Sequence, residues 1–480
     1  MSDKYAALAD TIKIEDITSN DANQNILLCL KDNDPGFDKL YMNKGNVDND
    51  DTVYTLKDGE EDIGWLGYYI GNSTKLQEIH FSVTIKDESF YIGLSCNKSI
   101  KEIHFFNVNL LDQLVFFMLG PFFKNNSNLI GIEVRDCDLG ANDIHQLSLA
   151  IGGCKESLKS FELSYNVIED DVNNMVDIIT SLSMHPQLTK LRLLDMIIGR
   201  SECMALATLL RCTTTQLRLL NLNINDIDDE GVEALVNSLS NVNQLQELNL
   251  SSNHSITIKG WKKVATLLEM PSSNIELLDI SYNEIRDEEA RIFANALKNN
   301  STLKTLNLKE CYFSLGQGWV PFSKLLCDTS SVNNTYMSNH TLWSIGDSRR
   351  PLPDDIRSIL ELNKNKDKQK VAMAKILRAH SHFDMHPFFE WEFKVLPIMI
   401  DWFTKASTRT TSFEEKIKKL TLAAVYDFIR EFPMLYIEPM TKQELLEYSA
   451  MEITLRGSRM QHASILEEVQ RCKTRALMRL

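Results

Sequence analysis

Two histidines and two glutamates recur at matching places along the chain and could together bind a metal ion. They are His80, His104, Glu133 and Glu162, and each stands between two apolar neighbours. If each lies in a strand, they share one face of a sheet, because alternate residues of a strand point to opposite sides. A divalent ion could then bridge two or three of them. Because no surrounding side chains that would orient these ligands are evident, we interpret them as surface groups and predict neither a metal nor a cofactor.

A second group of potential ligands alternates near the start of the last hundred residues. It consists of His380, His382, Asp384 and His386. An extended segment would place all four on one face, which would suit zinc. However, the segment joins two predicted helices and ends at Pro387, and histidines are common at helix ends for ordinary structural reasons. We interpret the group as the edge of a helical domain, with zinc binding as the alternative.

The sequence lacks the motifs that activate a nucleophile or hold a phosphate. There is no G-x-S-x-G, no G-x-x-x-x-G-K-[ST] and no kinase H-R-D set. Gly316 and Gly318 lack the third glycine of a dinucleotide-binding loop, so we expect a turn there. We predict that the chain is not an enzyme.

The histidines and glutamates of the first group belong to a repeat. Residues 217–227 read LRLLNLNINDI, which matches the frame L-x-x-L-x-L-x-x-N-x-L. The frame recurs with first positions at Leu76, Ile100, Leu129, Leu158, Leu188, Leu217, Leu245, Ile275 and Leu303, and in a degenerate copy at Val332 that includes Tyr336. By subtraction, these positions are 28 to 30 residues apart from Ile100 onward.

Each frame is followed by a helical pattern. About fifteen residues after a first position, apolar residues fall at i, i+3, i+4 and i+7, as in Val232, Leu235, Val236 and Leu239. We therefore predict an α/β horseshoe solenoid with parallel strands inside and helices outside, followed by a small all-α domain. The Asn at the ninth position, as in Asn225, can bond backbone groups that the strands leave unpaired.

This period, the helical outer layer and the mixture of Asn and Cys at the ninth position resemble the ribonuclease-inhibitor-like class of leucine-rich-repeat proteins. The resemblance covers roughly Leu76 to Leu342. The whole chain is also similar to uncharacterised leucine-rich-repeat proteins of microalgae that have a C-terminal helical extension. The resemblance implies the fold and no particular activity, because this scaffold carries many unrelated functions.

The change of pattern along the chain predicts its domains. We expect a poorly structured segment at 1–52, an N-terminal cap at 53–75 around Trp65, and about ten repeats at 76–345. A proline-containing linker at 346–353 then leads to a helical domain at 354–480. The caps are expected because an uncovered terminal repeat would expose its core.

The repeat frame also predicts a binding face. The residue between the fourth and sixth positions points out of the concave side, and ten such strands about 4.8 Å apart give a surface on the order of 45 Å long. Concave solenoid faces commonly bind partners, so we favour binding; the alternative is that these residues are ordinary surface groups. The predicted partner-binding residues are His104, Glu133, Arg135, Glu162, Tyr165, Arg192, Asp195, Asn221, Asn249, Asp279, Tyr282 and Asn307.

Composition limits the classes of binding partner and the cellular compartments that are expected. A formal net charge of -15 disfavours a nucleic-acid partner. The most apolar segment, residues 387–403, contains four charges and is not expected to span a membrane. The first twenty residues do not resemble a signal peptide, and nine cysteines show no disulfide spacing. These features favour the cytoplasm, while the oligomeric state stays open.

The favoured function is a non-catalytic, intracellular scaffold that binds a protein partner on the concave face. One alternative is a regulator of a small GTPase, resembling the leucine-rich-repeat GTPase activators. Those proteins have a strongly acidic tail, whereas residues 471–480 of this chain are basic. A metal-dependent enzyme built on either histidine group is a third possibility, which metal analysis would test.

Overall fold

The computed structural model describes residues 2–380, apart from 44–51, 57–62, 112, 155–156, 170–174, 213–215, 241–243, 313, 315–316 and 347–351. The chain divides into two compact units. The first contains Met1–Ile285 and Thr305–Tyr312, and the second contains Arg286–Lys304 and Phe313–Leu480. The predicted ligands His382, Asp384 and His386, and most of the predicted helical domain, lie outside the described residues.

The first unit is built on one parallel sheet. Its strands lie side by side in the order β13 (Thr305–Asn307), β12 (Leu277–Asp279), β11 (Glu247–Asn249), β10 (Leu219–Asn221), β9 (Lys190–Leu194), β7 (Ser160–Ser164), β5 (Gly131–Arg135), β4 (Glu102–Phe106), β3 (Glu78–Phe81), β1 (Lys39–Asn43) and β2 (Val53–Thr55). Every pair in this run is parallel. Two short strands, β6 (Asp138–Gly140) and β8 (Val167–Glu169), form a separate parallel pair.

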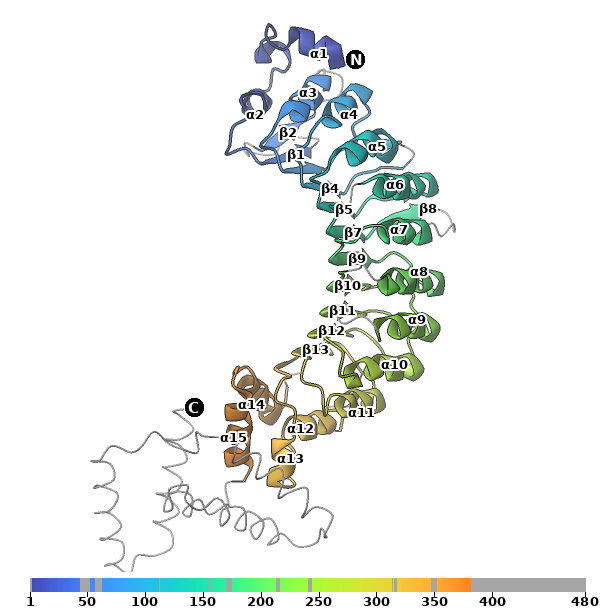
Figure 1. The fold of residues 1–480 in the computed structure, drawn as a ribbon, viewed down its shortest axis with the longest axis vertical. Helices are drawn as coiled ribbons and strands as arrows, with labels where there is room; N and C mark the ends of the chain where they lie inside the picture. Colours follow the sequence, from blue (N-terminus) through green and yellow to red (C-terminus); the bar gives the residue numbers. More distant parts are fainter. Residues whose placement is uncertain are drawn as a thin grey trace, which may run out of the picture. The chain divides into compact units, whose positions relative to one another are not determined.

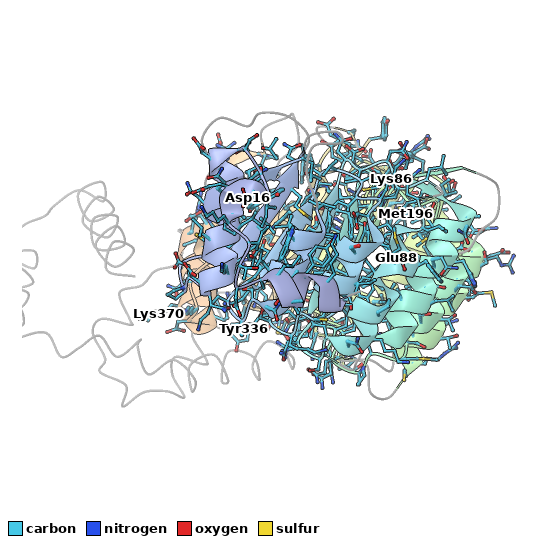
Figure 2. The ribbon with its side chains drawn as sticks, turned by 90° about the horizontal axis from the view of Figure 1, so that it is seen from above. Asp16, Lys86, Glu88, Met196, Tyr336 and Lys370 are labelled. Carbon is cyan, nitrogen blue, oxygen red and sulfur yellow. The ribbon has the colours of Figure 1, made fainter. Side chains whose placement is uncertain are left out.

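Helices cover one face of this sheet (Figure 1). They are α3 (Gly64–Asn72), α4 (Glu88–Leu94), α5 (Val115–Asn125), α6 (Ala141–Gly153), α7 (Met175–Leu182), α8 (Arg200–Arg211), α9 (Asp229–Leu239) and α10 (Ile258–Glu269). Side-chain caps begin several of them. Asp87 accepts from the N–H groups of Ser89 and Phe90 at the start of α4, next to Glu88 in the first turn (Figure 2).

The core lies between the strands and the helices, as the repeat frame predicts. Leu217, Leu220, Leu222 and Ile227 are fully buried, and Val232 of α9 is buried with them. Within a strand these leucines alternate with partly exposed residues, because a repeat buries only the face that meets its helix. The predicted α/β leucine-rich-repeat solenoid is therefore confirmed.

Where the ninth position is asparagine, its buried amide joins the repeat to the preceding one. Asn225 accepts from the N–H groups of Met196 (3.0 Å) and Ile198 (2.9 Å) and donates to the carbonyl of Leu193 (2.8 Å). Cys137 occupies the same position, and its thiol lies 3.7 Å from the carbonyl oxygen of Phe105 in the preceding repeat. Burial raises the pKa of Cys137 to about 11, so the thiol stays protonated and can donate.

The segment expected to be poorly structured differs from that prediction. It contains α1 (Ser2–Leu8), a 3-10 helix η1 (Ile14–Asp16), α2 (Asp21–Asp32) and strand β1. In β1, Leu40 and Met42 are fully buried and Tyr41 pairs with His80 of β3. The sequence prediction missed this strand because buried Phe37, instead of an aliphatic residue, holds the first position of its frame.

Two N-terminal helices complete the end of the sheet. Asn23 of α2 accepts from the N–H of Thr55 and donates to its carbonyl, both at 2.9 Å, so its amide occupies both groups of a β2 residue. Trp65 of α3 is buried, and the ring of Tyr5 from α1 meets it edge-on at 4.9 Å. These contacts cover the apolar end that a repeat array would otherwise expose.

The second unit contains α11 (Asp287–Ala296), α12 (Val320–Leu326), α13 (Val332–Tyr336), β14 (Ser344–Ile345), α14 (Asp354–Asn363) and α15 (Lys368–Ala379). The degenerate repeat predicted at Val332 is wrong, because Val332–Tyr336 is a helix and Tyr336 is not on a strand. The next strand instead has Leu342 and Ile345 buried, at the first and fourth positions of a later frame. The residues of α13 are inserted between the frame that opens at Leu303 and the one that opens at Leu342. The spacing between these two frames is therefore longer than the repeat period, which concealed the later frame.

Helix α15 is tied to the rest of the second unit by a buried lysine. The Nζ atom of Lys375 donates to the carbonyls of Leu326 (2.7 Å) and Asn339 (2.8 Å) and lies 3.0 Å from Nδ1 of His340. Burial lowers the pKa of Lys375 to about 7.

Candidate functional site

The sheet register places the predicted residues of the concave face in one line. Consecutive strands pair at this position from His80 to Asn307, and β1 adds Tyr41 at the beginning. We call this line the outward row; it contains Tyr41, His80, His104, Glu133, Glu162, Arg192, Asn221, Asn249, Asp279 and Asn307. From His104 onward each member is partly exposed while both of its chain neighbours are buried. Solvent therefore reaches the row.

At the N-terminal end of the row, aromatic rings stack across strands. The rings of Tyr41 and His80 lie 4.2 Å apart at 13°, and those of His80 and His104 lie 4.3 Å apart at 7°. Phe106 contacts both histidines at 5.8 Å. Since each strand supplies one ring at the same height, the register itself builds the stack.

Carboxylates surround the two histidines. Glu78 Oε1 lies 2.7 Å from His80 Nε2 and 3.7 Å from His104 Nε2, and Glu133 Oε2 lies 2.9 Å from His104 Nδ1. Lys39 pairs with the other oxygen of Glu78 at 2.7 Å. The sequence prediction omitted Glu78, although it lies two residues before His80 and so on the same face of β3.

The charges in this group are set by burial and by these contacts. Burial lowers the pKa of His80, and the neighbouring His104 lowers it further, against the opposing effect of Glu78. Burial alone would raise the pKa of Glu78, but hydrogen bonds from Lys39 and His80 outweigh it and hold that pKa below its usual value. At neutral pH the group therefore holds a neutral His80 beside an ionised Glu78.

The middle of the row is an ion pair. Glu162 and Arg192 approach to 3.7 Å on β7 and β9, and the hydroxyl of Ser164 donates to Glu162 at 3.0 Å. Both side chains are partly exposed, so solvent screens their attraction. Opposite charges on adjacent strands leave this part of the face polar and nearly neutral.

Three amides and one carboxylate form the C-terminal part of the row. Asn249 accepts from the N–H (2.8 Å) and the hydroxyl (2.7 Å) of Ser251. Asp279 accepts from Ser281 in the same way and from the amide of Asn307 at 2.8 Å. Asn221 accepts from the N–H of Asn223 at 3.0 Å. These side chains are thus bonded to the turn that follows their own strands.

The predicted flanking residues fall at two different positions. Arg135 ends strand β5, and its guanidinium lies 5.6 Å from the ring of Tyr165. Tyr165, Asp195 and Tyr282 lie in the turn that follows the strand and have left-handed backbone conformations, with φ of 54° to 56°. The same conformation recurs at Asn107, Asp136, Ile224, Ser252 and Glu310. Sequence reasoning missed it because none of these residues is glycine, which usually marks such a position.

The left-handed residues continue the sheet by one hydrogen bond. The N–H of Tyr165 donates to the carbonyl of Leu194 at 2.9 Å, and the N–H of Tyr282 donates to that of Lys309 at 2.8 Å. The ring of Tyr282 is 43% exposed. An exposed ring on a bonded backbone is suited to binding, because little freedom is lost on contact.

Among the residues that the structure describes, Glu78, His80 and His104 form a group that could hold a metal ion. Of the four residues considered from the sequence as metal ligands, only His80 and His104 belong to this group. Glu133 contacts the other nitrogen of His104, and Glu162 pairs with Arg192 instead.

Comparison with known proteins agrees with this geometry. The Leucine Rich repeat family model matches residues 215–236. The described repeats form a leucine-rich-repeat solenoid. The chain is 27% identical over 255 residues to human NACHT, LRR and PYD domains-containing protein 13, a match that covers 52% of this chain and 24% of that protein. It is 25% identical over 196 residues to protein 14 of the same name from Mus musculus, covering 40% of this chain and 16% of that one.

The chain thus matches about a quarter or less of the length of these leucine-rich-repeat relatives. Among solved structures, an internalin (inlF) from Listeria monocytogenes is 16% identical and has a TM-score of 0.35. That match covers 65% of this chain and 95% of the internalin. Separately, no described helix combines the length and the apolar character needed to cross a membrane.

Proposed function

We propose that this protein is a non-catalytic interaction scaffold that binds a protein partner on the outward row. The observation that carries the proposal is the register, which aligns partly exposed polar and aromatic side chains from successive strands. Arg135, Tyr165 and Tyr282 add exposed or partly exposed groups beside the row. Aromatic residues and arginine among polar groups are the composition that protein interfaces favour.

Two further assignments accompany this proposal. We assign the repeats to the ribonuclease-inhibitor-like class, because full helices follow the strands at 28- to 30-residue intervals. We also assign the protein to a reducing compartment such as the cytoplasm. Cys137 and Cys311 support this, because as thiols they can donate to carbonyls of the preceding repeat, each at 3.7 Å.

Exchanging the charges of one ion pair on the row tests the binding face. The double variant Glu162→Arg, Arg192→Glu keeps the net charge and the pair but inverts the field that a partner meets. We expect the tagged variant to lose the proteins that the wild-type chain captures from a lysate of its source cells, as measured by quantitative mass spectrometry. Circular dichroism should show an unchanged fold.

A matched exchange on the helical side provides the control. Glu233 of α9 and Lys263 of α10 form an ion pair at 2.6 Å, with both side chains about half exposed. The variant Glu233→Lys, Lys263→Glu should capture the wild-type set. If the row exchange captures that set as well, the partner binds elsewhere.

A further inference from the structure

We propose that Glu78, His80 and His104 form a binding site for a zinc-class divalent metal ion at the N-terminal end of the outward row. One ligand atom from each side chain lies within 4.8 Å of the others. Glu78 Oε1 is 2.7 Å from His80 Nε2 and 3.7 Å from His104 Nε2. In a tetrahedral zinc site with bonds of about 2 Å, ligand atoms lie roughly 3.3 Å apart. Small side-chain rotations bring this group to that spacing.

The surroundings of His104 orient it for this role. Its Nδ1 lies 2.9 Å from Glu133 Oε2, whereas its buried Nε2 has no hydrogen-bond partner among the described residues. A carboxylate on one imidazole nitrogen fixes the ring and directs the other nitrogen to a metal, which is the usual arrangement around zinc-binding histidines. Glu102 Oε2, at 3.5 Å from the same Nε2, can supply a fourth ligand.

The ligand side chains are also positioned by the fold before a metal ion binds. His80 is 7% exposed and is stacked between Tyr41 and His104. The three ligands come from the adjacent paired strands β3 and β4, so the backbone beneath them is fixed by the sheet. His80 Nδ1 has no partner among the described residues, so it can take up the proton that Nε2 gives up when a metal binds.

The donor set selects the class of ion. Two imidazoles with one or two carboxylates suit Zn²⁺, Co²⁺ and Ni²⁺, whereas Ca²⁺ and Mg²⁺ require mostly oxygen ligands. A bound dication would offset the negative charge of Glu78, Glu102 and Glu133 at this end of the row. The inference is independent of the protein partner proposed above.

Zinc titration of the full, chelator-treated chain tests the site. Isothermal titration calorimetry should show one more equivalent of Zn²⁺ bound by the wild type than by the double variant His80→Ala, His104→Ala. The difference is the readout, because other histidines of the chain could bind zinc independently. Glu133→Gln should keep the equivalent and weaken it by about 10- to 100-fold, as loss of an orienting carboxylate does.

Two variants control for the loss of a histidine or a glutamate. His254 is exposed, and Glu247 occupies in β11 the strand position that Glu78 occupies in β3. His254→Ala and Glu247→Gln should bind as the wild type does, whereas Glu78→Gln should lose the equivalent. If circular dichroism shows that the double histidine variant is unfolded, Glu78→Gln alone decides the test. Equal zinc binding by the wild type and by the folded ligand variants would overturn the proposal.

Discussion

The two halves of the outward row use the same backbone for different purposes. From Tyr41 to Arg192 the side chains contact each other across strands, through stacked rings and ion pairs. From Asn221 to Asn307 they accept from the N–H groups two residues further along the chain, in the turn after each strand. The polar atoms of the first half are therefore bonded mainly to other side chains, while many of those in the second half are bonded to backbone N–H groups.

The strands of the two halves also differ in length. Strands β4, β5, β7 and β9 each have five residues, whereas β10 to β13 each have three. In β5 and β7, Arg135 and Ser164 still pair with each other. In the later strands a side-chain oxygen takes the corresponding N–H, as Asn249 does for Ser251. Short polar side chains compete with a strand for its backbone in this way.

Core substitutions test whether the two halves differ only at the surface. Leu163→Ala and Leu220→Ala remove fully buried leucines at equivalent depth in the first and second halves. Each should lower the free energy of unfolding by about 2 to 5 kcal/mol through loss of burial and the resulting cavity. Chemical denaturation monitored by circular dichroism measures both. A negligible effect of Leu220→Ala would mean that the repeat frame is misplaced.

The two kinds of ninth-position residue, amide and thiol, should differ in how much they stabilise the fold. Asn225→Ala leaves the buried N–H groups of Met196 and Ile198 without an acceptor, which should cost about 1 to 3 kcal/mol of unfolding free energy. Cys137→Ala removes only a weak thiol donor and should cost less. The same denaturation experiment compares them, and an equal or larger loss for Cys137→Ala would contradict the role given to the buried amides.

Substitutions in the outward row should have the smallest effects on stability. Asn249→Ala removes two hydrogen bonds to Ser251 and should destabilise the protein by about 0.5 to 1.5 kcal/mol. Glu162→Ala breaks a long, partly exposed ion pair and should cost about 0 to 1 kcal/mol. Differential scanning fluorimetry with several replicates can rank the two. A larger loss for Glu162→Ala would show that the first half also uses its side chains for folding.

The repeat frame was sufficient to predict most of the sheet, because a buried leucine pattern and a helical stripe specify the same repeat independently. The outward row followed from strand alternation alone. Strand β1 and Tyr41 were missed because the first position of that frame is Phe37, while all the recognised frames open with an aliphatic residue. The strand at Ser344 was hidden by the α13 insertion.

The site was only partly accessible to sequence reasoning. His80 and His104 were found by their position in the frame, but Glu78 was missed because the position two residues before the outward row was not considered. The partner of each nitrogen depends on side-chain rotamers, which no spacing specifies. The left-handed turns were missed because residues such as Tyr165 and Tyr282 accept that conformation only where a hydrogen bond to the next repeat holds it.

The amide of Asn23 has a consequence for how copies of this protein meet. Strand β2 is the last strand at one edge of the sheet, and an open edge is a template on which another chain can add a strand. Asn23 bonds both the N–H and the carbonyl of Thr55, as the peptide group of a further strand would. Those two backbone groups are then no longer available to an added strand. This single side chain thereby opposes edge-to-edge polymerisation.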